Sequence, residues 1–101
     1  MKINESTEDY HDCVEALSKD VAETVIETLE AYSVPKEILD KIKGELAFNV
    51  CTLIDGGKDI KINSKSFTPN MTFLSEDSEE LLYSVNGSFT HEYVYDFTDD
   101  E

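Results

Sequence analysis

Two runs of apolar residues at helical spacing, separated by one proline, constrain this chain more than any other feature. In the first run the apolar positions recur every three or four residues from Tyr10 to Tyr32, which is the period of an amphipathic helix. Pro35 ends this run and suits the first turn of a second helix, whose apolar positions have the same spacing. We therefore predict helices over about 7–32 and 35–54. A connection this short makes them antiparallel neighbours.

After Gly57 the helical period gives way to the alternation of apolar and polar residues that is typical of strands, as in Ile60–Ile62. Asn86–Gly87 is the dipeptide that best fits a type I′ hairpin turn, and aromatic residues occupy alternate positions in the segment that follows it. The predicted strands cover about residues 59–63, 71–75, 81–85 and 89–97.

Together these elements predict one α+β domain over residues 1–101. Its N-terminal antiparallel helical hairpin packs on a C-terminal antiparallel β-meander of three to four strands. The length of 101 residues suits a single domain. The hydrophobic content of 40%, with five Tyr and five Phe, is too high for a disordered acidic tail.

Charge is the strongest functional signal. The formal net charge is −15, all eight basic residues are Lys, and the chain has no Arg. Residues 1–34 and 66–101 are strongly acidic, while residues 35–65 carry six Lys and five acids. A field of this sign repels nucleic acid and anionic membranes and attracts basic partners, so we expect no direct binding to either nucleic acid or membrane.

Acids on two predicted surfaces are the candidate partner-binding residues. On the first helix they recur at helical spacing with few Lys between them, and near the C-terminus they lie on the predicted outer face of the last strand or follow it. The predicted partner-binding residues are Glu23, Glu27, Glu30, Glu92, Asp96, Asp99 and Asp100.

The sequence offers little for catalysis or metal binding. No phosphate-binding, dinucleotide-binding, nucleophile-elbow or zinc-protease motif is present. Neighbouring residues such as His11–Asp12–Cys13 point in different directions on a helix and do not chelate together. Cys51 with either His11 or His91 is the one nucleophile–base combination worth naming. We therefore expect no cofactor and no metal, and both cysteines as free thiols.

These observations favour a non-enzymatic, acidic protein-binding module that occupies a basic surface of a partner. By size and charge it is analogous to inhibitors, immunity proteins or nucleic-acid mimics. The alternatives are a structural or regulatory homodimer formed through a sheet edge or the helical hairpin, and a small enzyme that uses Cys51 or His91. With neither a signal peptide nor a membrane span evident, the expected location is the cytoplasm.

Overall fold

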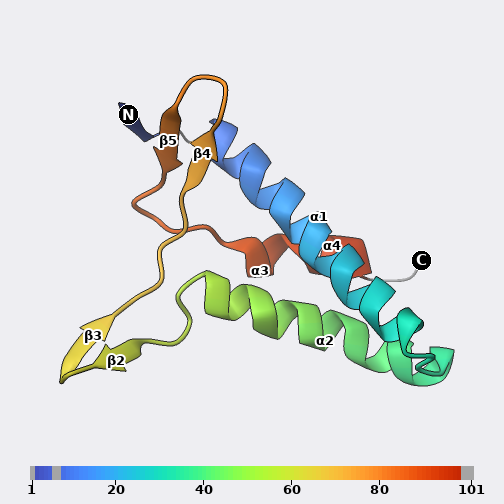
Figure 1. Cartoon of the computed structure of the whole chain (residues 1–101). Coiled ribbons are helices and arrows are strands. Elements are labelled where there is room, and N and C mark those ends of the chain that lie inside the picture. The colour runs from blue at the N-terminus through green and yellow to red at the C-terminus, as the bar shows by residue number, and fades with distance from the viewer. Residues whose placement is uncertain (1, 6–7, 99–101) are drawn as a thin grey trace.

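The computed structural model describes residues 2–5 and 8–98, and it confirms the α+β class and the N-terminal helical hairpin. Helix α1 spans Glu8–Ala31 and helix α2 spans Lys36–Ile54, close to the predicted bounds. The two helices pack against each other and diverge away from their short connection (Figure 1).

Both long helices end in the same kind of backbone motif. Ser33 and Gly56 have positive φ angles of 59° and 82°, and the residue after each donates its N–H to the carbonyl five positions earlier. This six-residue loop is the Schellman motif, which satisfies carbonyls that the last turn leaves without partners. A Cβ on Gly56 would lie 2.8 Å from the Pro69 carbonyl oxygen, so this position requires glycine.

The main sheet is mixed and differs from the predicted antiparallel meander. Strand β5 (Glu80–Tyr83) lies in the centre, with β4 (Phe73–Ser75) antiparallel on one side and β1 (Lys2–Glu5) parallel on the other. The strands predicted over 71–75 and 81–85 are therefore confirmed. The N-terminal strand was not predicted, and its parallel pairing with β5 makes the sheet mixed.

A separate two-stranded hairpin follows α2. Strands β2 (Ile60–Ile62) and β3 (Lys65–Phe67) pair antiparallel across Asn63–Ser64, both of which have positive φ. Two positive φ angles are the signature of a type I′ turn, so this hairpin forms here and not at Asn86–Gly87. All six strand residues are exposed, and the hairpin extends beyond the C-terminal end of α2 (Figure 1).

The strand predicted over 89–97 is wrong, because this segment forms two short helices. Helix α3 spans Thr90–Tyr93 and helix α4 spans Tyr95–Thr98. Thr90, Val94 and Thr98 are all fully buried, and their spacing of four residues is helical. The aromatic residues at alternate positions fit a strand equally well, but burial follows the helical period.

The core has two parts along α1. Near its N-terminal half, Tyr10, Val14 and Leu82 of β5 form one buried cluster, with the Phe73 ring edge-on to Tyr10 at 5.3 Å. Further along α1, a second cluster joins both long helices to the short C-terminal helices. It consists of Ala22, Ala47, Cys51 and Val94.

Candidate functional site

Three of the predicted partner-binding acids form a ridge on α1. Glu23, Glu27 and Glu30 are all exposed, and their spacing places them on the side of α1 opposite its buried residues. Glu23 lies 4.0 Å from Lys19 in an ion pair whose two side chains are about half-exposed, so the pair contributes little to stability. We call these three glutamates the acidic ridge.

The predicted C-terminal acids lie on a neighbouring part of the structure. Glu92 on α3 and Asp96 on α4 are both exposed, and α3 and α4 both contact α1 (Figure 1). The structure therefore brings two predicted groups of acids onto elements that pack together, although α3 and α4 are not the predicted strand. Asp99 and Asp100 lie outside the described residues.

A polar cluster that the sequence did not indicate joins the end of α2 to the start of α3. Asp55, whose side chain is only 5% exposed, accepts hydrogen bonds from the hydroxyls of Ser88 and Thr90 and from the backbone N–H of His91. Its second oxygen lies 2.5 Å from His91 Nδ1. The carboxylate thereby caps the N-terminus of α3, where backbone N–H groups lack partners within the helix.

The same contacts hold the Asp55 carboxyl in its ionised form. Burial by itself raises the pKa of Asp55, but the hydrogen bonds from Ser88, His91 and Thr90 lower it, and the net pKa lies below its ordinary value. Between these donors, Phe89 has a positive φ of 58°, which costs a bulky residue about 1–2 kcal/mol. The hydrogen bonds to Asp55 on both sides of Phe89 offset this strain.

In the nucleophile hypothesis, Cys51 of α2 and His91 of α3 lie on elements that pack together, and His11 is exposed on α1. The Cys51 thiol, however, is inaccessible. Cys51 is fully buried, and burial is the largest cause that raises its thiol pKa above the ordinary value, so little thiolate forms near neutral pH. His91 has a partly exposed ring, edge-on to Phe48, and directs Nδ1 at Asp55. The Ser88 hydroxyl donates its hydrogen bond to Asp55 and not to the imidazole. The cluster therefore has the geometry of a helix anchor.

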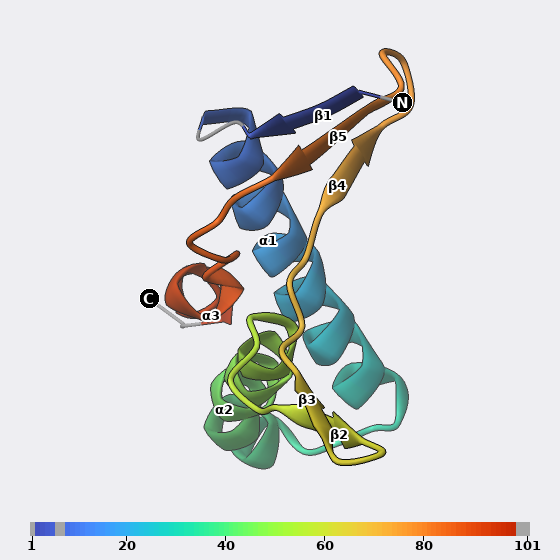
Figure 2. The ribbon, with the colours of Figure 1, turned by 90° about the vertical axis from the view of Figure 1, so that its left-hand side faces the viewer.

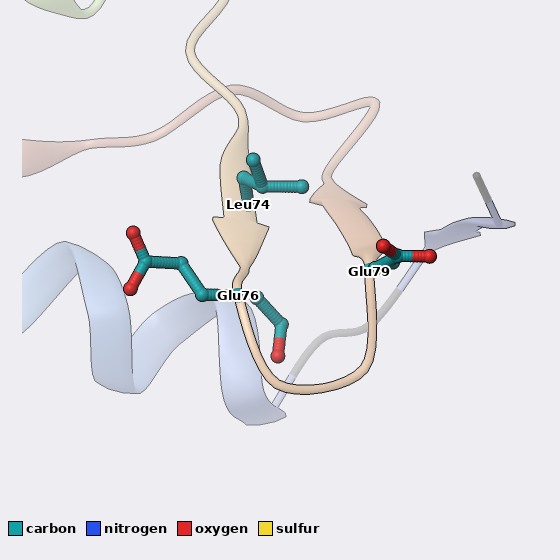
Figure 3. A pocket seen from close by; sticks show the side chains of 4 residues that line it. Leu74, Glu76 and Glu79 are labelled. Carbon is teal, nitrogen blue, oxygen red and sulfur yellow. The ribbon is translucent and has the colours of Figure 1, made fainter.

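The turn between β4 and β5 forms a separate shallow concavity of about 520 Å³, lined by Leu74, Ser75, Glu76 and Glu79. Figure 3 shows the Glu76 and Glu79 carboxylates on opposite sides of the turn. Because the two carboxylates do not converge, they do not form the pair that acid–base catalysis requires.

Neither a metal centre nor a membrane span is present in the described chain. Across residues 2–5 and 8–98, no three His, Cys, Asp or Glu side chains are grouped so that they could hold a metal ion. The helices of the same residues include none with the length and apolar content needed to cross a bilayer.

Sequence reasoning missed the Asp55 cluster for an identifiable reason. Asp55 stands before two glycines, a context typical of the end of a helix, and the residues that bind it lie more than thirty positions later. The available signal is the pair Ser88 and Thr90, since both residue types favour helix N-termini. This signal conflicts with the alternating aromatic residues that predict a strand over 89–97.

Comparison with known proteins adds no relative. No protein-family model matches the chain, and no curated protein or solved structure shows significant similarity to it.

Proposed function

We propose that the protein is a non-enzymatic binding module whose acidic ridge docks on a basic surface of a partner protein. The observation that carries this proposal is the composition of the exposed side of α1. All eight acids of this helix are exposed and it has only one lysine, while its large apolar side chains are all buried or half-buried. Such a surface attracts cations over a distance and offers carboxylates for contact.

The short C-terminal helices support the same role. They place Glu92 and Asp96 beside α1 without introducing any lysine, because residues 66–101 contain none. These two acids add to the negative field around α1 that attracts a basic partner. Small acidic inhibitors, immunity proteins and nucleic-acid mimics are functional analogues of such a module, and we propose an inhibitor-like role on that basis.

We further propose that the module acts in the cytoplasm. Cys13 and Cys51 are both free thiols in the structure, which is the state that a reducing compartment maintains.

The test measures binding to a synthetic lysine-rich helical peptide by fluorescence anisotropy at low and high salt. The ridge variant combines Glu23→Gln, Glu27→Gln and Glu30→Gln. Because exposed charge contacts contribute about 0.2–1 kcal/mol each, this variant should bind the peptide roughly 10-fold more weakly at low salt. Added salt should weaken binding of the unaltered protein and reduce this difference.

A matched control removes the same charge from another surface. The variant with Glu76→Gln, Asp77→Asn and Glu79→Gln neutralises three exposed acids on the β4–β5 turn. It should bind the peptide within about 2-fold of the unaltered protein, since these charges are remote from the ridge and screened by salt. Equal losses for both variants would show that the peptide responds to net charge alone, and the ridge would then not be the binding site.

A further inference from the structure

The molecule has more surface than a chain of its size normally exposes. Its accessible surface is 7170 Å², whereas a folded monomer of 11.4 kDa has about 5,800 Å². Its radius of gyration is 15.7 Å, compared with about 13 Å for a compact domain of this length. The extents of 46 × 38 × 21 Å describe a flat molecule, one that leaves a face of its secondary structure uncovered.

One uncovered apolar face lies on α2. Five large aliphatic side chains at helical spacing are each about one-third to one-half exposed, and together they form a stripe along the helix. They are Ile38 at 49%, Ile42 at 36%, Leu46 at 42%, Val50 at 38% and Leu53 at 55%. These side chains expose on the order of 400 Å² of apolar surface, a contiguous patch of the size that often has a function, unlike apolar residues that are exposed singly.

The stripe borders an apolar groove between the two long helices. Val50 lines a cavity of about 350 Å³ together with Leu17, Val21 and Val25 of α1. On the other side of α2, Gly44 and Phe48 contact Tyr95 of α4, and the two rings stack at 5.3 Å. Positions two residues apart on a helix differ by about 200°, so Leu46 and Val50 point away from α4.

The α1–α2 hairpin thus has two different faces. The covered face carries α3 and α4, which both contact α1 and α2, and Figure 2 shows α3 beside α1 and above α2. The open face consists of the α2 stripe and the groove residues of α1.

Charge identifies which molecule suits the open face. Helix α2 carries three lysines, Lys36, Lys41 and Lys43, and three acids, Glu37, Asp40 and Glu45, so its net charge is zero. Helix α1 carries eight acids and one lysine, and its acidic ridge lies opposite its buried side. A basic partner is attracted to α1 and gains no net electrostatic attraction from α2. A second copy that meets α2 brings two neutral surfaces together and leaves the acidic ridges apart.

We propose that the open face binds a second copy of this chain, with the α2 stripes of the two copies packed across a twofold axis. A twofold interface is self-complementary, and a stripe centred on one helix meets this requirement directly. The two hairpins then form a four-helix arrangement in which the stripe and groove are buried. A stable interface buries about 800 Å² per partner, and the stripe would form the apolar centre of such an interface. The acidic ridge stays exposed, so this inference is independent of the proposed function.

Sedimentation velocity of the full chain over a range of concentrations tests the proposal. We expect the mass to rise from 11.4 kDa toward twice that value as concentration increases. Added salt should tighten the association, because it screens the repulsion between two chains of net charge −15. This response is opposite to the one expected for the basic peptide on the acidic ridge.

Two double variants with equal net charge locate the interface. Leu46→Gln with Val50→Gln places glutamine twice in the stripe, and Lys41→Gln with Glu45→Gln places it twice at exposed positions outside the stripe. Burial of a large aliphatic side chain contributes about 1.5–3 kcal/mol, so the stripe variant should weaken dimerisation roughly 30-fold or more. The control variant should change it by less than about 3-fold, as expected of charges at an interface rim.

Folding is monitored for each variant by far-ultraviolet circular dichroism. If Leu46→Gln with Val50→Gln loses its helical signal, Ile38→Gln with Ile42→Gln tests the same stripe at another place. A protein that stays monomeric at every concentration would overturn the proposal, and so would a dimer that both double variants weaken equally. Binding of the lysine-rich peptide by a monomer with an intact stripe, lost in the stripe variant, would assign the open face to a basic helix instead.

Discussion

The covered and open faces of the α1–α2 hairpin differ in the size of the side chains that they present for packing. On the covered face, Ala22, Ala47 and Cys51 are small, and they let α3 approach so closely that Thr90 and Val94 are fully buried. On the open face, the same two helices carry large aliphatic side chains that the described chain covers only in part. Small residues thus mark the face that the chain packs against itself. Large exposed ones mark the face that we assign to a second copy.

The two faces also differ in polar anchoring. The covered face ends at Asp55, whose hydrogen bonds fix the position of α3 relative to α2. In the groove of the open face, the polar residues Asp20 and Thr24 are both exposed. Hydrogen bonds to a buried carboxylate specify one geometry, whereas an apolar stripe tolerates several. The fold of the monomer should therefore depend much more on the covered face.

The largest expected effect comes from loss of the anchor. Asp55→Ala leaves the donors of Ser88, Thr90 and His91 without their acceptor inside the protein. We expect the free energy of unfolding to fall by about 3–4 kcal/mol, measured by urea denaturation. Asp59→Ala removes an exposed acid from the same connection and should cost less than about 1 kcal/mol. Equal losses would mean that Asp55 is not an anchor.

A second prediction compares the two faces of α2 with the same new side chain. Ala47→Leu adds volume on the fully buried covered face, and overpacking there should cost about 2–3 kcal/mol. Val50→Leu adds volume on the open face, where Val50 is 38% exposed, and should change stability by less than about 0.5 kcal/mol. Urea denaturation at low protein concentration measures both. A large loss for Val50→Leu would show that the open face is packed within the monomer.

The sequence predicts the long helices well because each has a strong period and a clear stop. It does not predict β1, because Lys2–Glu5 contains one apolar residue, Ile3, and pairs with a strand more than seventy residues away. In residues 89–97 the apolar positions fit both the two-residue period of a strand and the period of a helix. Only packing against α1 and α2 decides between the two structures.

The candidate sites show the same limit. Exposure of Glu23, Glu27 and Glu30 follows from helical spacing once the buried side of α1 is known. Periodicity also finds the apolar positions of α2, but it does not tell which of them the chain covers. The five stripe residues and the buried Leu39 belong to one apolar pattern in the sequence, and only tertiary structure separates them.

A third prediction concerns pH and the anchor. The folded-state pKa of Asp55 is lowered, so its ionised form stabilises the fold above the unfolded-state pKa of about 3.8. This contribution is lost as the pH falls below that value and through the folded-state pKa. Asp55→Asn should cost about 1–2 kcal/mol near neutral pH, because it replaces charge-assisted hydrogen bonds with neutral ones.

Urea denaturation from about pH 7 to pH 3 tests this sign directly. The difference in unfolding free energy between Asp55→Asn and the unaltered protein should be constant near neutral pH and shrink below about pH 4. Growth of the difference in acid would contradict a lowered pKa for Asp55.

The smallest expected effect separates charge on α1 from apolar surface on α2. Like charges at helical spacing destabilise a helix, and salt screens them, so moderate salt should raise the unfolding temperature by about 2–4 °C. The variant with Glu23→Gln, Glu27→Gln and Glu30→Gln removes part of the repulsion and should show a smaller rise. Leu46→Gln with Val50→Gln leaves every charge in place and should keep the full rise when measured at protein concentrations too low for dimerisation.

An unfolding temperature that salt leaves unchanged or lowers would mean that scattered lysine pairs outweigh repulsion among the acids. The negative field would then not destabilise the fold. The acids of α1 would affect stability no more than the balanced charges of α2 do.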